Sequence, residues 1–325
     1  MREGKFLEIN KKTTNFFLEK GKGVGKKRFT QESGAYENML SNDEGKVNDR
    51  INENKIELTV EQETVVQEVM AAAQEVVDQF IERPVVLQRE QIAIVRSGAL
   101  KEMFSEVGTE KDAEKIAGHT FEHLQKVAVE ADKDTPNIEL ALILFHELMH
   151  LGSFYRIRLT QKKEHEALGH YRPERSGLSV LDSNGDAKFF RYLDEALTEK
   201  LARLYIETQK NNPLYKKNFS LREDKFSDAA PGTYVGYEEH DGRSVPVLKG
   251  AYHNELLATE DLVMRLYRKN NNRFASEEEL WNVFLEAKFT GKLLNLARLI
   301  EKTEGKDTFR LIGEQSNISQ EERDK

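Results

Sequence analysis

The pentapeptide His146-Glu147-Leu148-Met149-His150 places two imidazoles and one carboxylate close together in the sequence. On a helix, residues four apart lie about 40° apart around the axis and about 6 Å apart along it, so both rings can converge on one point. Two neutral imidazoles so placed can ligate one zinc ion. Glu147 lies beside them, where its carboxylate can take a proton from a water on the metal and pass it to a leaving amine. The motif therefore supplies two metal ligands and a general base.

The surrounding sequence predicts that this motif lies on a buried helix. Residues 138–151 are apolar almost all round, and after Glu139 their only strongly polar members belong to the motif. Thr135-Pro136 supplies an N-cap followed by a proline at the first helical position. Buried imidazoles and a carboxylate would be costly to desolvate without a shared partner, and a metal ion is such a partner. The alternative is a structural helical protein with a chance motif, whose histidines make ordinary hydrogen bonds.

A catalytic zinc ion needs a third protein ligand and an open position. The metzincin continuation is absent, because Ser153 and Arg156 stand where glycine and histidine are required. Further on, residues 193–199 read Leu-Asp-Glu-Ala-Leu-Thr-Glu at the start of a predicted helix. Glu195 and Glu199 stand one turn apart there, although acidic residues also favour a helix N-terminus whatever they bind.

Together, the HELMH motif and this later segment resemble the gluzincins, the clan of zinc peptidases that includes thermolysin and the large aminopeptidases. In that clan the third ligand is the Glu of a segment of the form NExxxD or NEGxxE. The resemblance implies that His146, His150 and Glu195 bind Zn²⁺ and that Glu199 orients a ligand histidine. Glu199 as the ligand itself is the alternative. The chain departs from the pattern at Asp194, where Asn is common, and in the 44 residues between His150 and Glu195.

A second histidine motif competes with the first. His119-Thr120-Phe121-Glu122-His123 matches the inverted form HxxEH, but the sequence turns polar directly after it. An exposed or half-buried helical turn is the alternative interpretation. His165 and His170 are five residues apart, which does not place them on one helical face.

Enzymes of the gluzincin type usually add a Tyr or His that donates a hydrogen bond to the oxyanion of the tetrahedral intermediate. We favour Tyr252, which follows Gly250 at the start of a predicted helix. The other candidates lie in or near the same loop-rich region: Tyr234, Tyr237, His240 and His253.

The remaining elements predict an α+β fold. A capping box, Thr59 with Gln62, begins a long amphipathic helix that ends before Pro84. Helices and short strands do not alternate regularly, which favours α+β over a parallel α/β fold.

The resemblance implies a zincin-like core, in which a short twisted sheet packs on the active-site helix and an edge strand pairs with the substrate. Lys126–Glu130 is our candidate for that edge. The other predicted elements are strands at 85–87 and 92–95, a hairpin over 176–192 turning at 183–186, a helix over 194–206, a loop-rich region at 209–251, and helices at 254–268, 276–288 and 290–303.

Composition limits the classes of protein to which the chain can belong. Its 325 residues include no cysteine, so any metal must be held by His, Asp or Glu. The net charge of −8 argues against a nucleic-acid groove, and no apolar run resembles a signal peptide or a membrane span. We therefore expect a cytoplasmic protein without a nucleic-acid or membrane partner.

Residues 1–55 are polar, and residues 1–30 carry nine Lys and Arg against three Glu, so we predict a flexible basic leader before a domain over 56–325.

These observations predict zinc-dependent hydrolysis of a peptide bond by a metal-activated water, with a peptide or protein as substrate. A catalytically silent zincin-fold protein that binds zinc as a scaffold is the alternative. The intact Glu147 favours the enzyme. The sequence specifies neither the substrate nor the oligomeric state.

Overall fold

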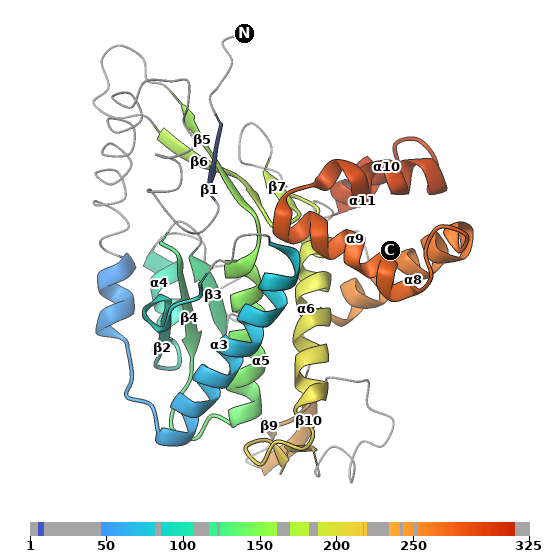
Figure 1. Cartoon of the computed structure of the whole chain (residues 1–325). Helices are drawn as coiled ribbons and strands as arrows, with labels where there is room; N and C mark the ends of the chain where they lie inside the picture. The colour runs from blue at the N-terminus through green and yellow to red at the C-terminus, as the bar shows by residue number, and fades with distance from the viewer. Residues whose placement is uncertain are drawn as a thin grey trace, which may run out of the picture.

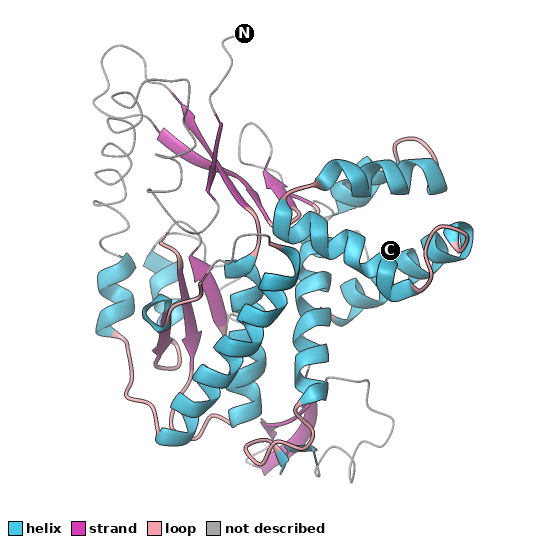
Figure 2. Ribbon diagram, viewed as in Figure 1, coloured by secondary structure: helices cyan, strands magenta, loops and turns pink. Residues whose placement is uncertain are grey.

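The chain has a mixed α+β fold in which helices predominate (Figures 1 and 2). The computed structural model describes residues 6–9, 47–81, 86–106, 117–121, 124–160, 170–181, 188–216, 218–219, 234–240, 243–249 and 252–315. Within these residues the strands form three separate groups, drawn in magenta in Figure 2. No described helix combines the length and apolar character needed to cross a membrane.

Three helices form the centre of the fold: α3 (Val60–Phe80), α5 (Asn137–Gly152) and α6 (Arg191–Thr208). Helix α5 packs against both of the others (Figure 1). The predicted capping box at the start of α3 is present, because Thr59 and Gln62 each accept a hydrogen bond from the other's backbone N–H. As predicted, α5 is buried on nearly all sides. Its position at the centre explains why it is almost wholly apolar.

A three-stranded sheet covers another side of α5 and has the order β2 (Ile92–Val95), β4 (Lys126–Glu130), β3 (Gly118–Phe121). Strand β4 runs parallel to β2 and antiparallel to β3. The predicted strand at 126–130 is therefore present, but its assignment as the edge was wrong. All three central residues of β4 are buried, which is typical of a middle strand, and β3 is the edge beside α5.

The register of β3 determines which backbone groups face its outer edge. The backbone N–H of Glu130 donates to the carbonyl of Ala117 over 2.8 Å, so this pair is hydrogen-bonded across the strands. Hydrogen-bonded pairs alternate along an antiparallel ladder. Gly118 and Thr120, which stand opposite Val129 and Val127, therefore direct their N–H and C=O groups away from β4. Within the described residues, this edge is not covered by a further strand of the sheet.

A second, antiparallel sheet joins α5 to α6 and has the order β1-β5-β6-β7-β8. The predicted hairpin is present in its last two strands, because Val180 pairs with Phe189 and Leu181 with Lys188. Its predicted turn at 183–186 lies outside the described residues. The longer strands of this sheet were not predicted from the sequence. The strands are β1 (Phe6–Ile9), β5 (Tyr155–Thr160), β6 (His170–Ser176), β7 (Ser179–Leu181) and β8 (Lys188–Phe189).

Two described segments fall inside the predicted leader. Strand β1 pairs with β5, and residues 47–53 are helical. Ile51 is fully buried in a small cluster with residues of the three-stranded sheet. The predicted boundary at residue 55 is therefore too late, because residues 47–55 pack with the folded part of the chain.

Helices α8, α9 and α10 pack beside α6 around a second apolar core, with α11 against α10 (Figure 1). They correspond to the predicted C-terminal helices, and Ser276 caps α9 as predicted. The region expected to be loop-rich instead contains a hairpin, β9 with β10, and residues 86 and 87 of the predicted first strand are not in a strand. The elements not yet bounded are η1 (Arg89–Gln91), α4 (Ala99–Glu106), β9 (Tyr234–His240), β10 (Arg243–Lys249), α8 (His253–Asn270), α9 (Glu277–Thr290), α10 (Leu293–Glu304) and α11 (Thr308–Glu314).

Candidate metal centre

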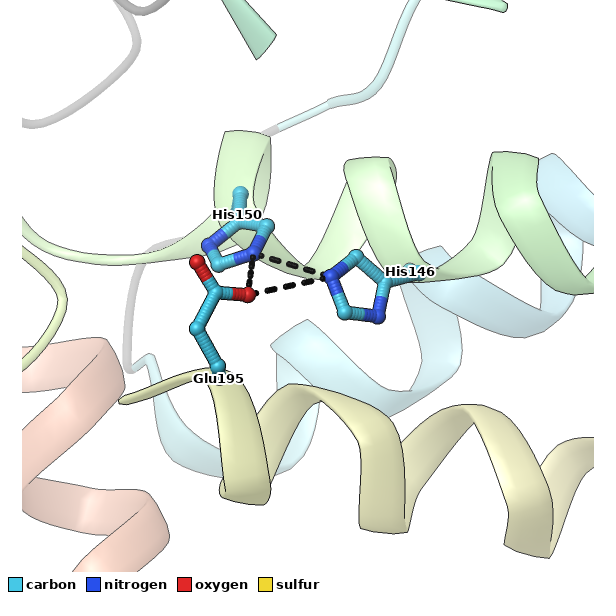
Figure 3. A group of neighbouring side chains, drawn as sticks. All are labelled: His146, His150 and Glu195. Carbon is cyan, nitrogen blue, oxygen red and sulfur yellow. Dashed lines mark hydrogen bonds and ion pairs between the residues drawn. The ribbon is translucent and has the colours of Figure 1, made fainter. Parts of the chain in front are cut away.

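The three predicted ligands lie together between α5 and α6. His146 and His150 project from one side of α5, and Glu195 projects towards them from the first turns of α6 (Figure 3). Oε2 of Glu195 lies 3.3 Å from Nε2 of His146 and 3.1 Å from Nε2 of His150, and the two nitrogens are 3.2 Å apart. Within the described residues, this is the one group of three or more such side chains that could hold a metal ion.

The size of this triangle fits a tetrahedral zinc site. Bonds of about 2.0–2.1 Å at tetrahedral angles separate neighbouring ligand atoms by about 3.3 Å. The three observed separations, 3.1–3.3 Å, agree with that value. Three atoms occupy only one face of a tetrahedron, so a fourth position remains for water or substrate, as catalytic sites require.

The outer nitrogen of each histidine ring faces a second carboxylate. Nδ1 of His150 lies 3.3 Å from Oδ2 of Asp194, and Nδ1 of His146 lies 3.7 Å from Oε2 of Glu199. Such a partner holds the ring orientation and favours the tautomer that leaves Nε2 free to bind a metal. Glu199 therefore lies behind a histidine of the centre, where the resemblance implied a carboxylate that orients a ligand. The role of Asp194 was not predicted, although its place directly before Glu195 could have suggested it.

Buried cations in turn hold these two outer carboxylates. Nζ of Lys288 lies 2.9 Å from Oδ1 of Asp194, and Nε of Arg203 lies 2.7 Å from Oε1 of Glu199. Arg191 faces Oε1 of Glu195 at 3.8 Å, but its side chain is 44% exposed and therefore well solvated. With neutral histidines, the carboxylates of the centre and the two cations that contact them carry a net charge of −2, to which buried Arg175, whose charge interacts with that of Asp194, adds one positive charge. The net charge of −2 belongs to four carboxylates and two cations: Glu147, Asp194, Glu195, Glu199, Lys288 and Arg203. A divalent cation would offset this excess of negative charge.

Without an ion, protons on the histidines can supply the same charge. Burial by itself lowers the pKa of His150, but the charge of Glu195 and hydrogen bonds with Asp194 and Glu195 raise it to about 10. Burial also opposes protonation of His146, yet its hydrogen bond with Glu195 and the nearby carboxylate of Glu199 raise its pKa. The pKa of Glu195 moves the other way: burial raises it, but the two histidines hold it well below its usual range. Protons and a divalent cation therefore compete for one electrostatic site.

This competition predicts that zinc binding releases protons. Below a pH of about 10 the ring of His150 is protonated in the metal-free protein, and a ligand ring must be neutral. We expect between one and two protons to leave per zinc ion at pH 7.5, and the affinity for zinc to rise with pH up to about pH 10. Titration calorimetry in two buffers of different ionisation enthalpy measures the release. Binding at that pH with no net proton release would contradict this electrostatic description.

Glu147 is held by strand β3. The Thr120 hydroxyl lies 2.6 Å from Oε2 of Glu147, to which it can donate, and 2.9 Å from the backbone carbonyl of the same residue. Gly118 lies on the same face of β3, where a Cβ atom would stand 2.9 Å from Cγ and 3.3 Å from Oε1 of Glu147 and 2.7 Å from Cγ2 of Ile143. The glycine therefore provides room for the glutamate. The hydroxyl fixes Oε2, and Oε1 remains the oxygen available for proton transfer.

Of the candidates for the oxyanion donor, Tyr252 lies in the centre. Its ring stacks on that of His146, with centroids 5.7 Å apart and planes within 11°. Burial raises the pKa of Tyr252, so its hydroxyl stays protonated at neutral pH and can donate. Its φ of 49° lies in the left-handed region, a conformation found often at functional sites. The side chains of the other candidates lie outside the described part of the structure: Tyr234, Tyr237, His240 and His253.

The competing motif does not have the geometry of a helical metal site. His119 lies in β3, where its ring packs edge-on against Phe104 and Phe121. Side chains alternate between the two faces of a strand, so His119 and Thr120 point in opposite directions. Glu122 and His123 lie outside the described residues, as do His165 and the side chain of His170.

Comparisons with protein-family models, with curated proteins and with solved structures found no match to this chain.

Proposed function

We propose that this chain is a zinc-dependent peptidase with a zincin-like core, in which His146, His150 and Glu195 bind the metal and Glu147 is the general base. The observation that carries the proposal is the convergence of three ligand atoms within 3.3 Å of one another, beside a carboxylate that is not a ligand. Zinc held there would polarise the scissile carbonyl and lower the pKa of a water molecule towards 7.

In this proposal the protein's own groups move the proton and orient the substrate. Oε1 of Glu147 accepts a proton from the attacking water and delivers it to the leaving amine, while Thr120 holds Oε2 in place. Tyr252 donates a hydrogen bond to the oxygen that becomes negative in the transition state. Asp194 and Glu199 keep both histidine rings oriented throughout.

The outer edge of β3, which no further strand covers in the part of the chain that the structure describes, supports a peptide substrate. Gly118 and Thr120 direct backbone donors and acceptors outwards from β3, and the Thr120 side chain contacts Glu147. An extended peptide that pairs with this edge would form main-chain hydrogen bonds and lie close to the general base. Strand addition recognises the peptide backbone and leaves the choice of side chains to neighbouring pockets.

The proposal is tested with zinc-loaded, full-length protein and a mixed peptide library analysed by mass spectrometry. We expect cleavage that a chelator abolishes and that added zinc restores. Stoichiometric zinc without cleavage of any peptide would refute the peptidase and favour the silent scaffold. Absence of zinc binding would refute both.

Replacement of Tyr252 by phenylalanine is expected to lower kcat for peptide cleavage by about 10²-fold, with little change in KM or in zinc affinity. The ring that stacks on His146 is retained, and only the donor is lost. Tyr267→Phe, in the helix that Tyr252 directly precedes, is the control, because the hydroxyl of Tyr267 contacts the carbonyl of Ala275 instead. Equal kcat values for Tyr252→Phe and the wild type would exclude Tyr252 as the donor.

A further inference from the structure

Lys288 is a charged residue that no solvent reaches, and it belongs to a helix that supplies no metal ligand. It lies near the end of α9 in the C-terminal helical group, and its exposed fraction is 0%. Its Nζ donates to Oδ1 of Asp194 over 2.9 Å. A buried ammonium is strongly disfavoured unless a carboxylate compensates it, so the Lys288 and Asp194 side chains depend on each other.

The carboxylate of Asp194 is fixed from several directions. Oδ1 accepts from Lys288 and also from the backbone N–H of Leu178 over 2.7 Å, and Oδ2 faces Nδ1 of His150. At Gly177, where φ is +57°, a Cβ atom would stand 2.2 Å from Oδ1. The chain therefore leaves room for this carboxylate at one side and holds it with two donors. The charge of Lys288 also lowers the pKa of Asp194 against the effect of burial.

His146 is also backed by a carboxylate and a cation, but here both come from the same helix. Arg203 and Glu199, behind His146, are four residues apart on α6, so one helix supplies both. Behind His150, the cation and the carboxylate come from different helices and are 94 residues apart. The orientation of His150 consequently depends on how α9 packs against α6.

We propose that Lys288 is a positioning residue of the metal centre: it fixes the carboxylate of Asp194, which orients the imidazole of His150 for metal binding. The proposal requires the metal site but not peptide hydrolysis. It assigns to the C-terminal helices a part in building a centre whose ligands all lie on α5 and α6.

The sign of the change in zinc affinity distinguishes positioning from simple electrostatics. Removal of a positive charge close to a divalent cation would by itself strengthen cation binding. Loss of the donor that holds Asp194 would instead let the ring of His150 leave its orientation and weaken binding. We expect the second effect to dominate, because the ammonium contacts the carboxylate directly.

The test measures zinc dissociation constants by chelator competition for the folded wild type and four variants. We expect Lys288→Met and Asp194→Asn each to weaken zinc binding by about 10–100-fold, since each leaves one partner of the buried pair without the other. The double variant Asp194→Asn/Lys288→Met should recover most of the affinity, because asparagine keeps an acceptor oxygen for Nδ1 of His150 without needing a cation. Lys200→Met is the control. It removes a partly exposed lysine of α6 that pairs with Glu260 of α8, and it should leave the zinc affinity unchanged.

Several outcomes would overturn the proposal. Unchanged or tighter zinc binding by Lys288→Met would leave only an electrostatic or structural role for the lysine. If that variant fails to fold, as judged by circular dichroism, the comparison of Asp194→Asn with the double variant decides, and equal affinities would refute the coupling. Failure of the wild type to bind zinc would instead refute the metal site itself.

Discussion

Replacement of Glu147 by glutamine is expected to lower the rate of peptide hydrolysis by about 10²–10⁴-fold while zinc remains bound. Glutamine has nearly the same shape, and its carbonyl oxygen can still accept the hydrogen bond from Thr120 that fixes Oε2 in the wild type. An amide cannot accept a proton, however, so the attacking water loses its base. The measurement is kcat for a cleaved peptide, together with zinc content per chain.

Glu139→Gln is a suitable control for this experiment. Glu139 lies in the first turn of α5, about two turns before the motif, so the same helix loses the same charge at a distance from the centre. We expect this variant to retain both activity and zinc. Equal activity in Glu147→Gln and wild type would exclude Glu147 as the base. Loss of zinc together with activity would show that the residue supports the metal instead.

Replacement of His150 or Glu195 by alanine is expected to weaken zinc binding by about 10³-fold or more. Structural zinc sites bind the ion with roughly 12 kcal/mol, and an equal share for each of three ligands is about 4 kcal/mol, which corresponds to about 10³-fold in the dissociation constant. Chelator competition measures this constant. At the concentrations used for assays, the variants should therefore lose peptide cleavage as well.

His119→Ala is the matched control for the ligand variants, because it removes a histidine of the competing motif. Its ring packs against Phe104 and Phe121 on the opposite face of β3 from Thr120, so zinc affinity should not change. Loss of zinc from His119→Ala with retention by His150→Ala would move the metal site to the inverted motif and contradict the account.

The sequence could predict the centre because its main parts are local. The spacing of His146 and His150 has meaning only on a helix, and the apolar residues around them predict that helix and its burial. Glu195 was assigned from the resemblance of residues 193–199 to the gluzincin pattern, and the hairpin before it accounts for the long interval because it returns the chain to nearly the same place. These signals extend over a few residues each.

Other parts of the centre depend on contacts that no local pattern specifies. Lys288 lies 94 residues from Asp194, and a lysine near the end of a helix is ordinarily exposed. Thr120 was noticed only as part of a histidine motif, whereas its hydroxyl contacts Glu147 across the interface between strand and helix. The order of strands in a sheet is likewise a tertiary property, which is why Lys126–Glu130 could be identified as a strand but not as the central one.

Some elements were missed although the sequence carries a signal for them. Tyr155, Ile157 and Leu159 alternate with arginines in β5, the period expected of a strand. Strands β9 and β10 pair His240 with Arg243, so Asp241-Gly242 connects them, and this dipeptide is a strong hairpin signal. The many Gly, Pro and Asn residues of 209–251 favoured the prediction of a loop-rich region, so the hairpin signal was missed.

The central claim is that one zinc ion binds between α5 and α6, and crystallography at the zinc absorption edge tests it most directly. In crystals of the zinc-loaded protein we expect one anomalous peak about 2.0–2.2 Å from Nε2 of His146, Nε2 of His150 and Oε2 of Glu195. Zinc bound in solution with no anomalous peak at these atoms, or with its peak at other side chains, would contradict the account.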